Sequence, residues 1–358
     1  MATLPPGGLV LITGANGYIA GVTVQKLLDL GYSVRGTVRS VEKHKWMLSH
    51  YGPNFSLIEV PEMSADNAFD KAVEGVDGIA HIASMVEFNP DPHAIIPGAI
   101  KSAVTILEAA AKEPKVKSVV YTSSQAACVM LEPGKPYAIT PGSWNDASLK
   151  LAWEPSEEQT FGRGIINYMA AKTGAEQASF KWVDEHKPHF TFNSVVPNCN
   201  FGTVIAPTHT GFPTSAGLVK LLFYGNTMGA GLIPPEWYVD VEDSALLHVA
   251  ALTQPDVKNE RIFAFGERFT WNQILGLFRK FCPDRTFLKD IEEPPADRGT
   301  VTNERAAELL KRLGKPNGFS TLEEGIQKAV KSIVAVEGLE LPKSELEKQA
   351  EQMVLQAK

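Results

Sequence analysis

A tyrosine and a lysine four residues apart, Tyr168 and Lys172, form a pair that could carry out acid–base chemistry. Residues at this spacing lie on one face of a helix, so the phenol and the ammonium would be neighbours. A free phenol has a pKa of about 10, and a nearby ammonium lowers that pKa by favouring the phenolate. Such a pair can give a proton to a carbonyl oxygen during reduction, or take it back. An amphipathic surface helix is the alternative explanation.

A run of hydroxyl residues could supply a second donor. Residues 118–122 are typical of a buried strand, and Ser123 and Ser124 follow directly. An open parallel sheet places its ligand at the carboxyl ends of its strands. A serine at this point could donate to a substrate oxygen. Alternatively, these hydroxyls satisfy backbone groups where the strand ends.

A glycine-rich turn lies between the first predicted strand, 9–13, and the first helical stretch. Gly14 permits a tight turn, Gly17 lets the backbone approach a pyrophosphate, and the helix N-terminus offers free N–H groups to its oxygens. Ala20 supplies the third small residue of this fingerprint. The turn therefore predicts a dinucleotide site. The expected contacts are Thr13, Gly14, Asn16, Gly17, Tyr18 and Ile19.

The end of the second predicted strand, 33–38, indicates which dinucleotide binds. No carboxylate stands there to bind the ribose hydroxyls of NAD; Arg39 follows the strand instead, and Lys43 comes shortly after. A guanidinium pairs well with a 2′-phosphate through two parallel hydrogen bonds. We infer NADP(H) as the cofactor. A solvated surface arginine is the alternative.

The elements that position these residues alternate along the first two hundred residues. Short β-branched runs alternate with helical stretches, as in a parallel sheet covered on both faces. We expect an α/β fold with a doubly wound parallel sheet of the Rossmann type. The predicted strands are 9–13, 33–38, 56–60, 78–82, 118–122 and 191–196. The predicted helices are 22–30, 65–74, 98–113, 303–313 and 321–336.

The pattern changes after Cys199, where glycine, proline and threonine become frequent and residues 216–238 are nearly uncharged. We expect a smaller C-terminal substrate lobe. The predicted organisation is an NADP(H)-binding domain at 1–200 with the catalytic residues, and a substrate lobe at 201–335 with some segments returning to the sheet. A helical tail follows at 336–358.

Composition narrows the function classes. The 358 residues include 34 Lys+Arg and 41 Asp+Glu, a net charge of −7 without a basic stripe, so a nucleic-acid surface is not expected. The three cysteines form no Cys-x-x-Cys pair, and no histidine spacing suggests a metal site. The N-terminal apolar run is too short for a signal peptide or a membrane span. We expect a cytoplasmic protein.

Taken together, the turn at 14–20, Ser124 and the Tyr168–Lys172 pair resemble the extended short-chain dehydrogenase/reductase family. Residues 81–84, 121–124 and 193–198 are similar to the branch with plant dihydroflavonol reductases and the yeast and fungal NADPH-dependent carbonyl (aldehyde) reductases. The resemblance covers residues 8–335, including 234–239 and 269–272.

The resemblance implies a role for each of these residues. Tyr168 would donate the proton in reduction, and Lys172 would bind the nicotinamide ribose and tune Tyr168. Ser124 would polarise the carbonyl, with Ser123 as the alternative. Three further residues would lie along the cofactor: Ala83, Ser84 and Pro197.

The first part of the predicted lobe, up to Val257, is poor in cations. Between Gly164 and Glu260 there is no arginine, and Lys220 is the only lysine from Asn198 to Val257. A nucleotide-diphosphate sugar needs cationic or forked donors, so a small uncharged substrate is expected. The candidate pocket residues are mostly apolar or aromatic, with core packing as the alternative for each. They are Met85, Phe88, Phe161, Ile165, Asn198, Trp237 and Tyr238.

These observations favour an NADPH-dependent carbonyl reductase that transfers hydride to small, largely apolar aldehydes, ketones or keto esters. We expect a monomer or homodimer whose partner is the small-molecule substrate, with no nucleic acid, membrane or metal. The alternatives are an epimerase or dehydratase of nucleotide sugars and a non-catalytic NADP(H)-sensing regulator.

Overall fold

A computed structural model describes residues 4–84, 88–156, 160–344 and 347–348. Its main sheet has seven parallel strands in the order β3-β2-β1-β4-β5-β7-β10. The order changes direction between β1 and β4, which is where such sheets bind ligands. The predicted doubly wound parallel sheet is confirmed. The strands are β1 (Leu9–Ile12), β2 (Ser33–Val38), β3 (Phe55–Glu59), β4 (Gly78–His81), β5 (Ser118–Thr122), β7 (Thr191–Pro197) and β10 (Arg261–Ala264).

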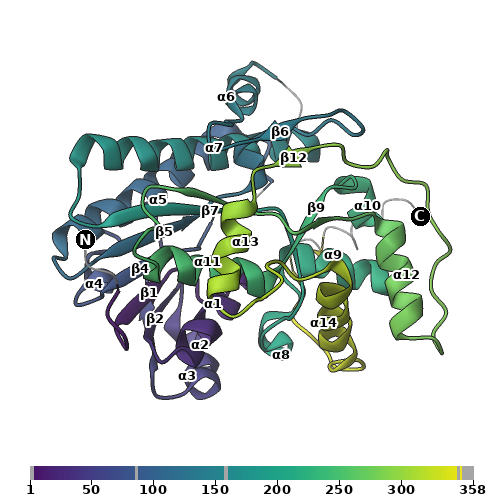
Figure 1. Ribbon diagram of the computed structural model, residues 1–358, viewed down its shortest axis with the longest axis horizontal. Coiled ribbons are helices and arrows are strands. Elements are labelled where there is room, and N and C mark those ends of the chain that lie inside the picture. Colours follow the sequence, from purple (N-terminus) through teal and green to yellow (C-terminus); the bar gives the residue numbers. More distant parts are fainter. Residues whose placement is uncertain (1–3, 85–87, 157–159, 345–346, 349–358) are drawn as a thin grey trace.

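Helices cover both faces of this sheet because its strands are apolar on both sides. In β1, Val10 and Ile12 face one core and Leu11 faces the other, as the two-residue period of a strand requires. The first core packs against α1 (Tyr18–Asp29), α11 (Val241–Thr253) and α13 (Glu304–Arg312). The second packs against α4 (Asp70–Val73), α5 (Pro92–Lys112) and α7 (Phe161–His186). The short helices α2 (Val41–His44), α3 (Trp46–Tyr51) and α6 (Asp146–Trp153) complete this part (Figure 1).

Local capping sets the start of the two long helices. The side chain of Asp91 accepts a hydrogen bond from the His93 amide, and Pro92 occupies the first turn of α5, where its missing N–H is not needed. Thr160 caps α7 by accepting from the Arg163 amide. The predicted helix 98–113 therefore begins too late, because Pro97 lies inside α5 and does not end it.

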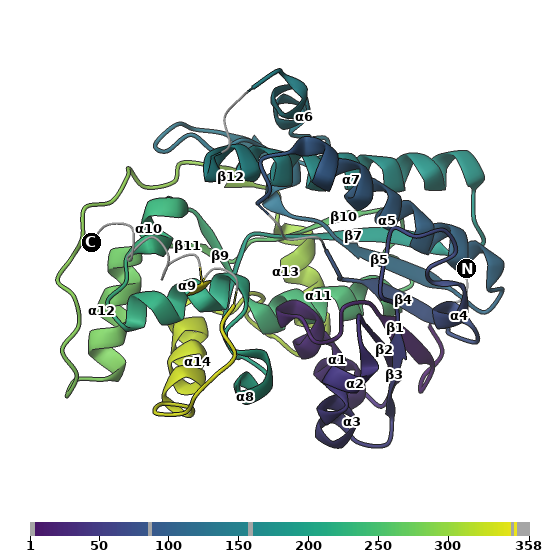
Figure 2. The same cartoon turned by 180° about the vertical axis from the view of Figure 1, so that it is seen from behind.

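A second lobe packs beside the sheet (Figures 1 and 2). It has its own core, built around Phe201, Trp271 and Phe278. Its three-stranded sheet contains β8 (Cys199–Phe201), β9 (Trp237–Asp240) and β11 (Glu267–Arg268). Its helices are α8 (Pro207–Thr210), α9 (Thr214–Phe223), α10 (Met228–Leu232), α12 (Trp271–Phe281) and α14 (Leu322–Val334). The chain returns to the main sheet through α11, β10 and α13. The residue boundaries between domains stay a prediction.

Two short segments join the parts. After β5 and the single turn η1 (Gln125–Ala127), β6 (Ala138–Ile139) pairs with β12 (Thr300–Val301), which ties the stretch before α6 to the chain before α13. At the C-terminal end, Glu347 forms an ion pair with Lys220 of α9 at 2.7 Å. Most of the predicted helical tail lies outside the described residues.

One helix, α5, is long and apolar enough to span a membrane by length and composition. Its buried residues, however, pack against the sheet and α7, and core helices of soluble proteins have the same composition. The helix is therefore weak evidence for a membrane span, and the absence of membrane association stays a prediction.

Candidate active site

The glycine turn after β1 has the geometry that a dinucleotide requires. Gly14 has a φ of 63°, and a Cβ added there would lie 2.9 Å from the Cβ of Ala83, so a larger residue would clash. The Gly17 amide donates to the Gly14 carbonyl at 2.8 Å, and exposed Gly17 precedes the first turn of α1. The turn leaves helix N–H groups open to an anion.

Two of the predicted cofactor residues point away from this turn. The Thr13 hydroxyl lies 3.0 Å from His81 Nδ1 and accepts from the Ala83 amide at 3.0 Å, which fixes the end of β1 to the end of β4. Tyr18 packs into the core of the second lobe. The side chains of these two residues are engaged elsewhere, and their contact with the cofactor through the backbone of the turn stays a prediction. Burial lowers the pKa of His81 to about 3, so this histidine is neutral at physiological pH.

The two cationic residues predicted to bind the cofactor follow β2. Arg39 directly follows β2, Lys43 lies on α2, and both side chains are exposed. Within the described residues, neither has a hydrogen-bond or ion-pair partner. Asn16, on the glycine turn, and Ile19, in the first turn of α1, are half-buried. An arginine without a partner at this place is available to a phosphate.

Helix α7 brings Tyr168 and Lys172 to the carboxyl end of β5. The Lys172 ammonium donates to the carbonyl of Thr122, the last residue of β5, at 3.0 Å. Tyr168 and Lys172 line a small cavity together with the predicted cofactor residues Ala83 and Ser84. The pair and the segment that follows β4 therefore meet at one place, beside the glycine turn.

The structure separates the two candidate serines. Ser123 donates to the buried carboxylate of Glu176 at 2.6 Å. The Ser124 backbone is extended, so its side chain points to the opposite side from Ser123. There its hydroxyl lies close enough to the Tyr168 phenol to oppose the rise in the pKa of that phenol. Ser124 is the serine that lies beside the phenol.

Burial dominates the electrostatics of the pair. It raises the pKa of Tyr168, and the nearby Cys199 thiol raises it further, while the Ser124 hydroxyl opposes both. Burial also lowers the pKa of Lys172 to about 8, and the charge of Glu176 opposes this shift. The predicted lowering of the phenol pKa by the ammonium is therefore wrong for this structure, because desolvation outweighs it. The phenol is protonated at neutral pH.

A buried ion pair between Glu176 and Arg261, which was not predicted from the sequence, lies next to Ser123. Each oxygen of Glu176 accepts two hydrogen bonds, one from a serine and one from the guanidinium of Arg261 on β10. The serines are Ser123 and Ser194, both at 2.6 Å, and the guanidinium also lies 3.7 Å above the Trp144 ring. One signal was available: Glu176 follows Lys172 by four residues, on the same helix face.

The predicted pocket residues fall into two groups. Phe88 contacts both Phe161 and Tyr168, with ring centroids 4.9 and 5.6 Å apart, and Ile165 lies on the same face of α7. These residues form an aromatic and apolar wall beside the phenol. Met85 lies outside the described residues.

The second group lies where the chain passes from β7 to β8 and at the start of β9. Pro197 ends β7 beside β5, and Asn198 follows it toward β8. Trp237 begins β9, but Tyr238 is fully buried and donates to the Thr321 carbonyl at 3.1 Å. Successive strand residues face opposite sides, so Tyr238 belongs to the lobe core and its predicted pocket role is wrong.

The sequence interpretation also passed over Glu236, directly before Trp237. Its carboxyl is 5% exposed, and Oε1 accepts a hydrogen bond from the Cys199 thiol at 3.0 Å. Burial raises the pKa of Glu236 to about 7. The only sequence signal was its place between the predicted residues Asn198 and Trp237, since nothing in its spacing indicates burial.

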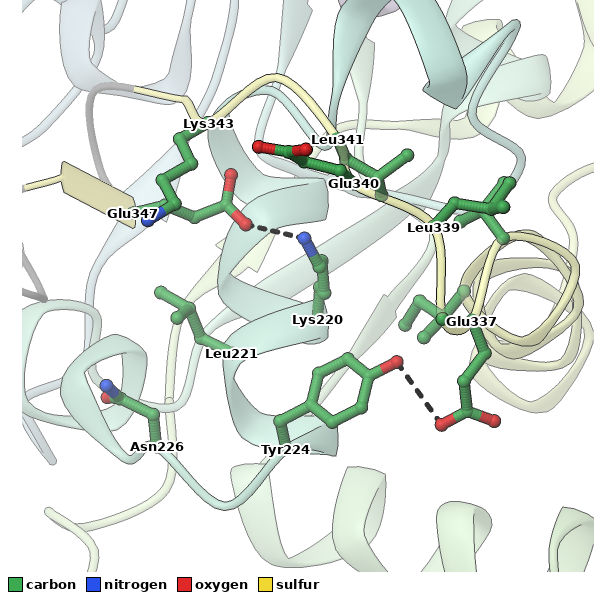
Figure 3. Close-up of a pocket in the computed structure, with 13 residues that line it drawn as sticks. Lys220, Leu221, Tyr224, Asn226, Glu337, Leu339, Glu340, Leu341, Lys343 and Glu347 are labelled. Carbon is green, nitrogen blue, oxygen red and sulfur yellow. Dashed lines mark hydrogen bonds and ion pairs between the residues drawn. The ribbon is translucent and has the colours of Figure 1, made fainter.

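A larger cavity of about 820 Å³ lies elsewhere, between α9 and the segment that follows α14 (Figure 3). The Lys220–Glu347 ion pair and the hydrogen bond from Tyr224 to Glu337 cross it. None of the predicted catalytic or cofactor residues lines this cavity.

Comparison with known proteins agrees with this geometry. Aldehyde reductase 2 of Sporidiobolus salmonicolor is 37% identical over 93% of this chain and 98% of its own length. The ketoreductase nvfG of Aspergillus novofumigatus is 34% identical over 91% and 97%. The structure of yeast methylglyoxal/isovaleraldehyde reductase Gre2 complexed with NADPH superposes with a TM-score of 0.75 at 25% identity, covering 92% and 99% of the two chains.

These relatives confirm the resemblance to extended short-chain dehydrogenases/reductases. The model of the NAD dependent epimerase/dehydratase family matches residues 10–211, which is more than half of the chain. The chain belongs to this family.

Proposed function

We propose that this protein is an NADPH-dependent carbonyl reductase that uses Ser124, Tyr168 and Lys172. The observation that carries the proposal is their meeting at the carboxyl edge of the sheet: Tyr168 and Lys172 share a cavity with Ala83 and Ser84 next to the glycine turn, and Ser124 lies beside the phenol. The relatives named aldehyde reductase and ketoreductase support it.

The residues present fit NADP(H). Gly14 leaves the close approach to Ala83 that any Cβ would fill, and Arg39 offers a guanidinium without a partner among the described residues. Gly14, Gly17 and the first turn of α1 would hold the pyrophosphate, and Arg39 the 2′-phosphate. When bound, NADPH supplies the hydride. The NADPH complex of the Gre2 relative supports this cofactor.

The protein's own residues handle the carbonyl oxygen. Ser124 and Tyr168 place two hydroxyl donors side by side, and their hydrogen bonds to the oxygen strengthen as negative charge develops on it. Tyr168 is the proton donor, because burial keeps its phenol protonated at neutral pH. Lys172, held by the Thr122 carbonyl, places a positive charge behind the phenol that eases the loss of this proton.

The surroundings favour a small, largely apolar aldehyde, ketone or keto ester. Phe88, Phe161 and Ile165 supply the wall, and the stretch from Asn198 to Val257 offers a single cation for a diphosphate. That cation is Lys220, which is already paired with Glu347. The nucleotide-sugar reaction is therefore less well supported. A sensor without activity would not need the complete Ser124, Tyr168 and Lys172 set.

The test is to mix purified protein with NADPH and a panel of aldehydes, ketones and keto esters, and to follow the loss of nicotinamide absorbance. We expect consumption with several members and much less with NADH. NADPH binding without consumption by any member would favour the sensor. Tightly retained NAD in the purified protein would favour an epimerase.

A further inference from the structure

Glu236 directly precedes β9 of the second lobe, and one of its two carboxyl oxygens has no hydrogen-bond partner among the described residues. That oxygen is Oε2, which is buried, whereas Oε1 accepts from the Cys199 thiol at 3.0 Å. Buried polar atoms are nearly always hydrogen-bonded, so such an atom calls for an explanation. An unmet acceptor or donor next to an active site is commonly completed by the ligand.

Two unused donors accompany this carboxyl. Trp237 Nε1 and Asn198 Nδ2 are buried without hydrogen-bond partners. Five such side-chain atoms occur in the described part of the chain, and three of them belong to this cluster. Strand β8 pairs in parallel with β9, with Cys199 opposite Tyr238, and this register places Asn198 next to Trp237. The Asn198 amide lies close enough to lower the pKa of Glu236.

The cluster adjoins the reacting centre. The Cys199 thiol that binds Glu236 lies close enough to Tyr168 to raise the pKa of that phenol. Asn198 follows Pro197 at the end of β7, and β7 pairs with β5, the strand that Ser124 follows. A substrate whose carbonyl oxygen meets Tyr168 would therefore extend toward these unused atoms.

The neighbouring charges indicate what kind of group fits. Asp297 is already occupied, because Tyr137 donates to it at 2.7 Å and Arg268 pairs with it at 3.2 Å. No cation of the described residues pairs with Glu236, and the charge of Asp297 disfavours a second carboxylate there. A carboxyl whose protonated form is favoured by burial, with two N–H donors beside it, suits an uncharged oxygen, either a carbonyl or a hydroxyl. It does not suit a phosphate.

We propose that Glu236, Trp237 and Asn198 form a polar subsite that binds a second, uncharged oxygen group of the carbonyl substrate. Keto esters and hydroxy ketones would then be preferred over simple ketones of the same length. This inference rests on the proposed carbonyl reductase function and narrows its substrate class.

The test compares ethyl acetoacetate with methyl pentyl ketone, which has the same chain length but no ester. The measured quantity is the ratio of the two kcat/KM values with NADPH. We expect the wild type to prefer the ester, and Glu236→Leu to lower the ratio about tenfold, as the loss of a buried hydrogen bond to substrate implies. Glu236→Gln should retain part of the preference, because an amide can still form a hydrogen bond.

Two further variants keep the test decisive. Trp237→Phe removes only the N–H and keeps the ring that packs on Phe265, so it replaces Glu236→Leu if that variant fails to fold. It should lower the ratio by a smaller factor. Glu323→Leu makes the same change at an exposed ion pair with Lys280 and should leave the ratio unchanged.

Equal losses on both substrates, or an unchanged ratio in both Glu236→Leu and Trp237→Phe, would overturn the subsite while leaving the reductase in place. If the wild type consumes NADPH with neither of these compounds nor with any other carbonyl, the proposed function fails and the subsite fails with it.

Discussion

Two buried glutamates, one on α7 beside the main sheet and one directly before β9 in the second lobe, differ in how their oxygens are bound. On the sheet side, both oxygens of Glu176 are satisfied by Arg261 and two serines. On the lobe side, Glu236 has one thiol partner and one free oxygen. The first region is complete without a ligand, and the second is not.

The comparison distinguishes two uses of a buried carboxyl group. A fully hydrogen-bonded carboxylate fixes the elements that it joins, here α7, β7, β10 and the end of β5. An incompletely bonded one destabilises the fold and suits a site that a ligand completes. We therefore assign a positioning role to Glu176 and a binding role to Glu236, and four predictions test this division.

The largest expected effect follows from removing the cation of the sheet-side pair. Arg261→Met leaves the Glu176 charge buried with only two serine partners, which should lower the free energy of unfolding by about 3–5 kcal/mol. Urea denaturation measures this value. The double variant Glu176→Leu with Arg261→Met should recover most of the loss. A single variant as stable as the wild type would show that the pair does not fix the fold.

The next largest effect is the dependence of the free energy of unfolding on pH that Glu236 causes. Burial raises the folded-state pKa of Glu236 from 4.5 to about 7, so its protonated form is favoured in the folded state. Its contribution to stability is fully present below pH 4.5 and is lost as pH rises through about 7. Between about pH 5 and 8, wild type should lose about 2–3 kcal/mol relative to Glu236→Gln in urea unfolding. Parallel pH profiles for the two proteins would contradict the assignment.

The adjacent serines provide a smaller and more local test. Ser124→Ala removes a donor to the developing oxyanion and should lower kcat about a hundredfold. Ser123→Ala removes a hydrogen bond to Glu176 and should lower the free energy of unfolding by about 1–3 kcal/mol with kcat nearly unchanged. Steady-state kinetics and urea unfolding of both variants check this. The reverse pattern would make Ser123 the catalytic hydroxyl.

The smallest expected effect concerns two arginines, one whose hydrogen bonds are satisfied within the protein and one without a partner among the described residues. Arg35 donates to the carbonyls of Ala72 and Glu74, whereas Arg39 has no partner within the described residues. Arg39→Asp should reduce the preference for NADPH over NADH at least about tenfold, as the loss of a charged phosphate contact implies. Lys45→Asp, which removes a nearby exposed cation paired with Glu42, is the matched control. An unchanged preference in Arg39→Asp would show that the 2′-phosphate binds elsewhere.

Much of the sheet could be predicted because its strands are buried on both faces and read as continuous apolar runs. The bounds predicted for 33–38 and 118–122 agree with β2 and β5. Helices were harder where capping decides their ends: Asp91 starts α5 six residues before the predicted start, and α4 is much shorter than predicted.

The site could be predicted where one motif fixes it and not where distant segments meet. Tyr168, Lys172 and the glycine turn follow from spacing within one helix or one turn. Glu236 could not be predicted, because its burial depends on the pairing of β8 with β9 and on the Cys199 thiol. The cytoplasmic location and the monomeric or homodimeric state stay predictions.

The most direct measurement of the central claim is made on Tyr168→Phe, which removes one oxygen from the catalytic set. NADPH binding, followed by fluorescence titration, and turnover of a carbonyl substrate are measured on the same preparation. We predict a dissociation constant close to that of the wild type and a kcat about a thousandfold lower, the size expected for a lost proton donor. Near-normal turnover would contradict the assignment of Tyr168 as the group that protonates the substrate oxygen.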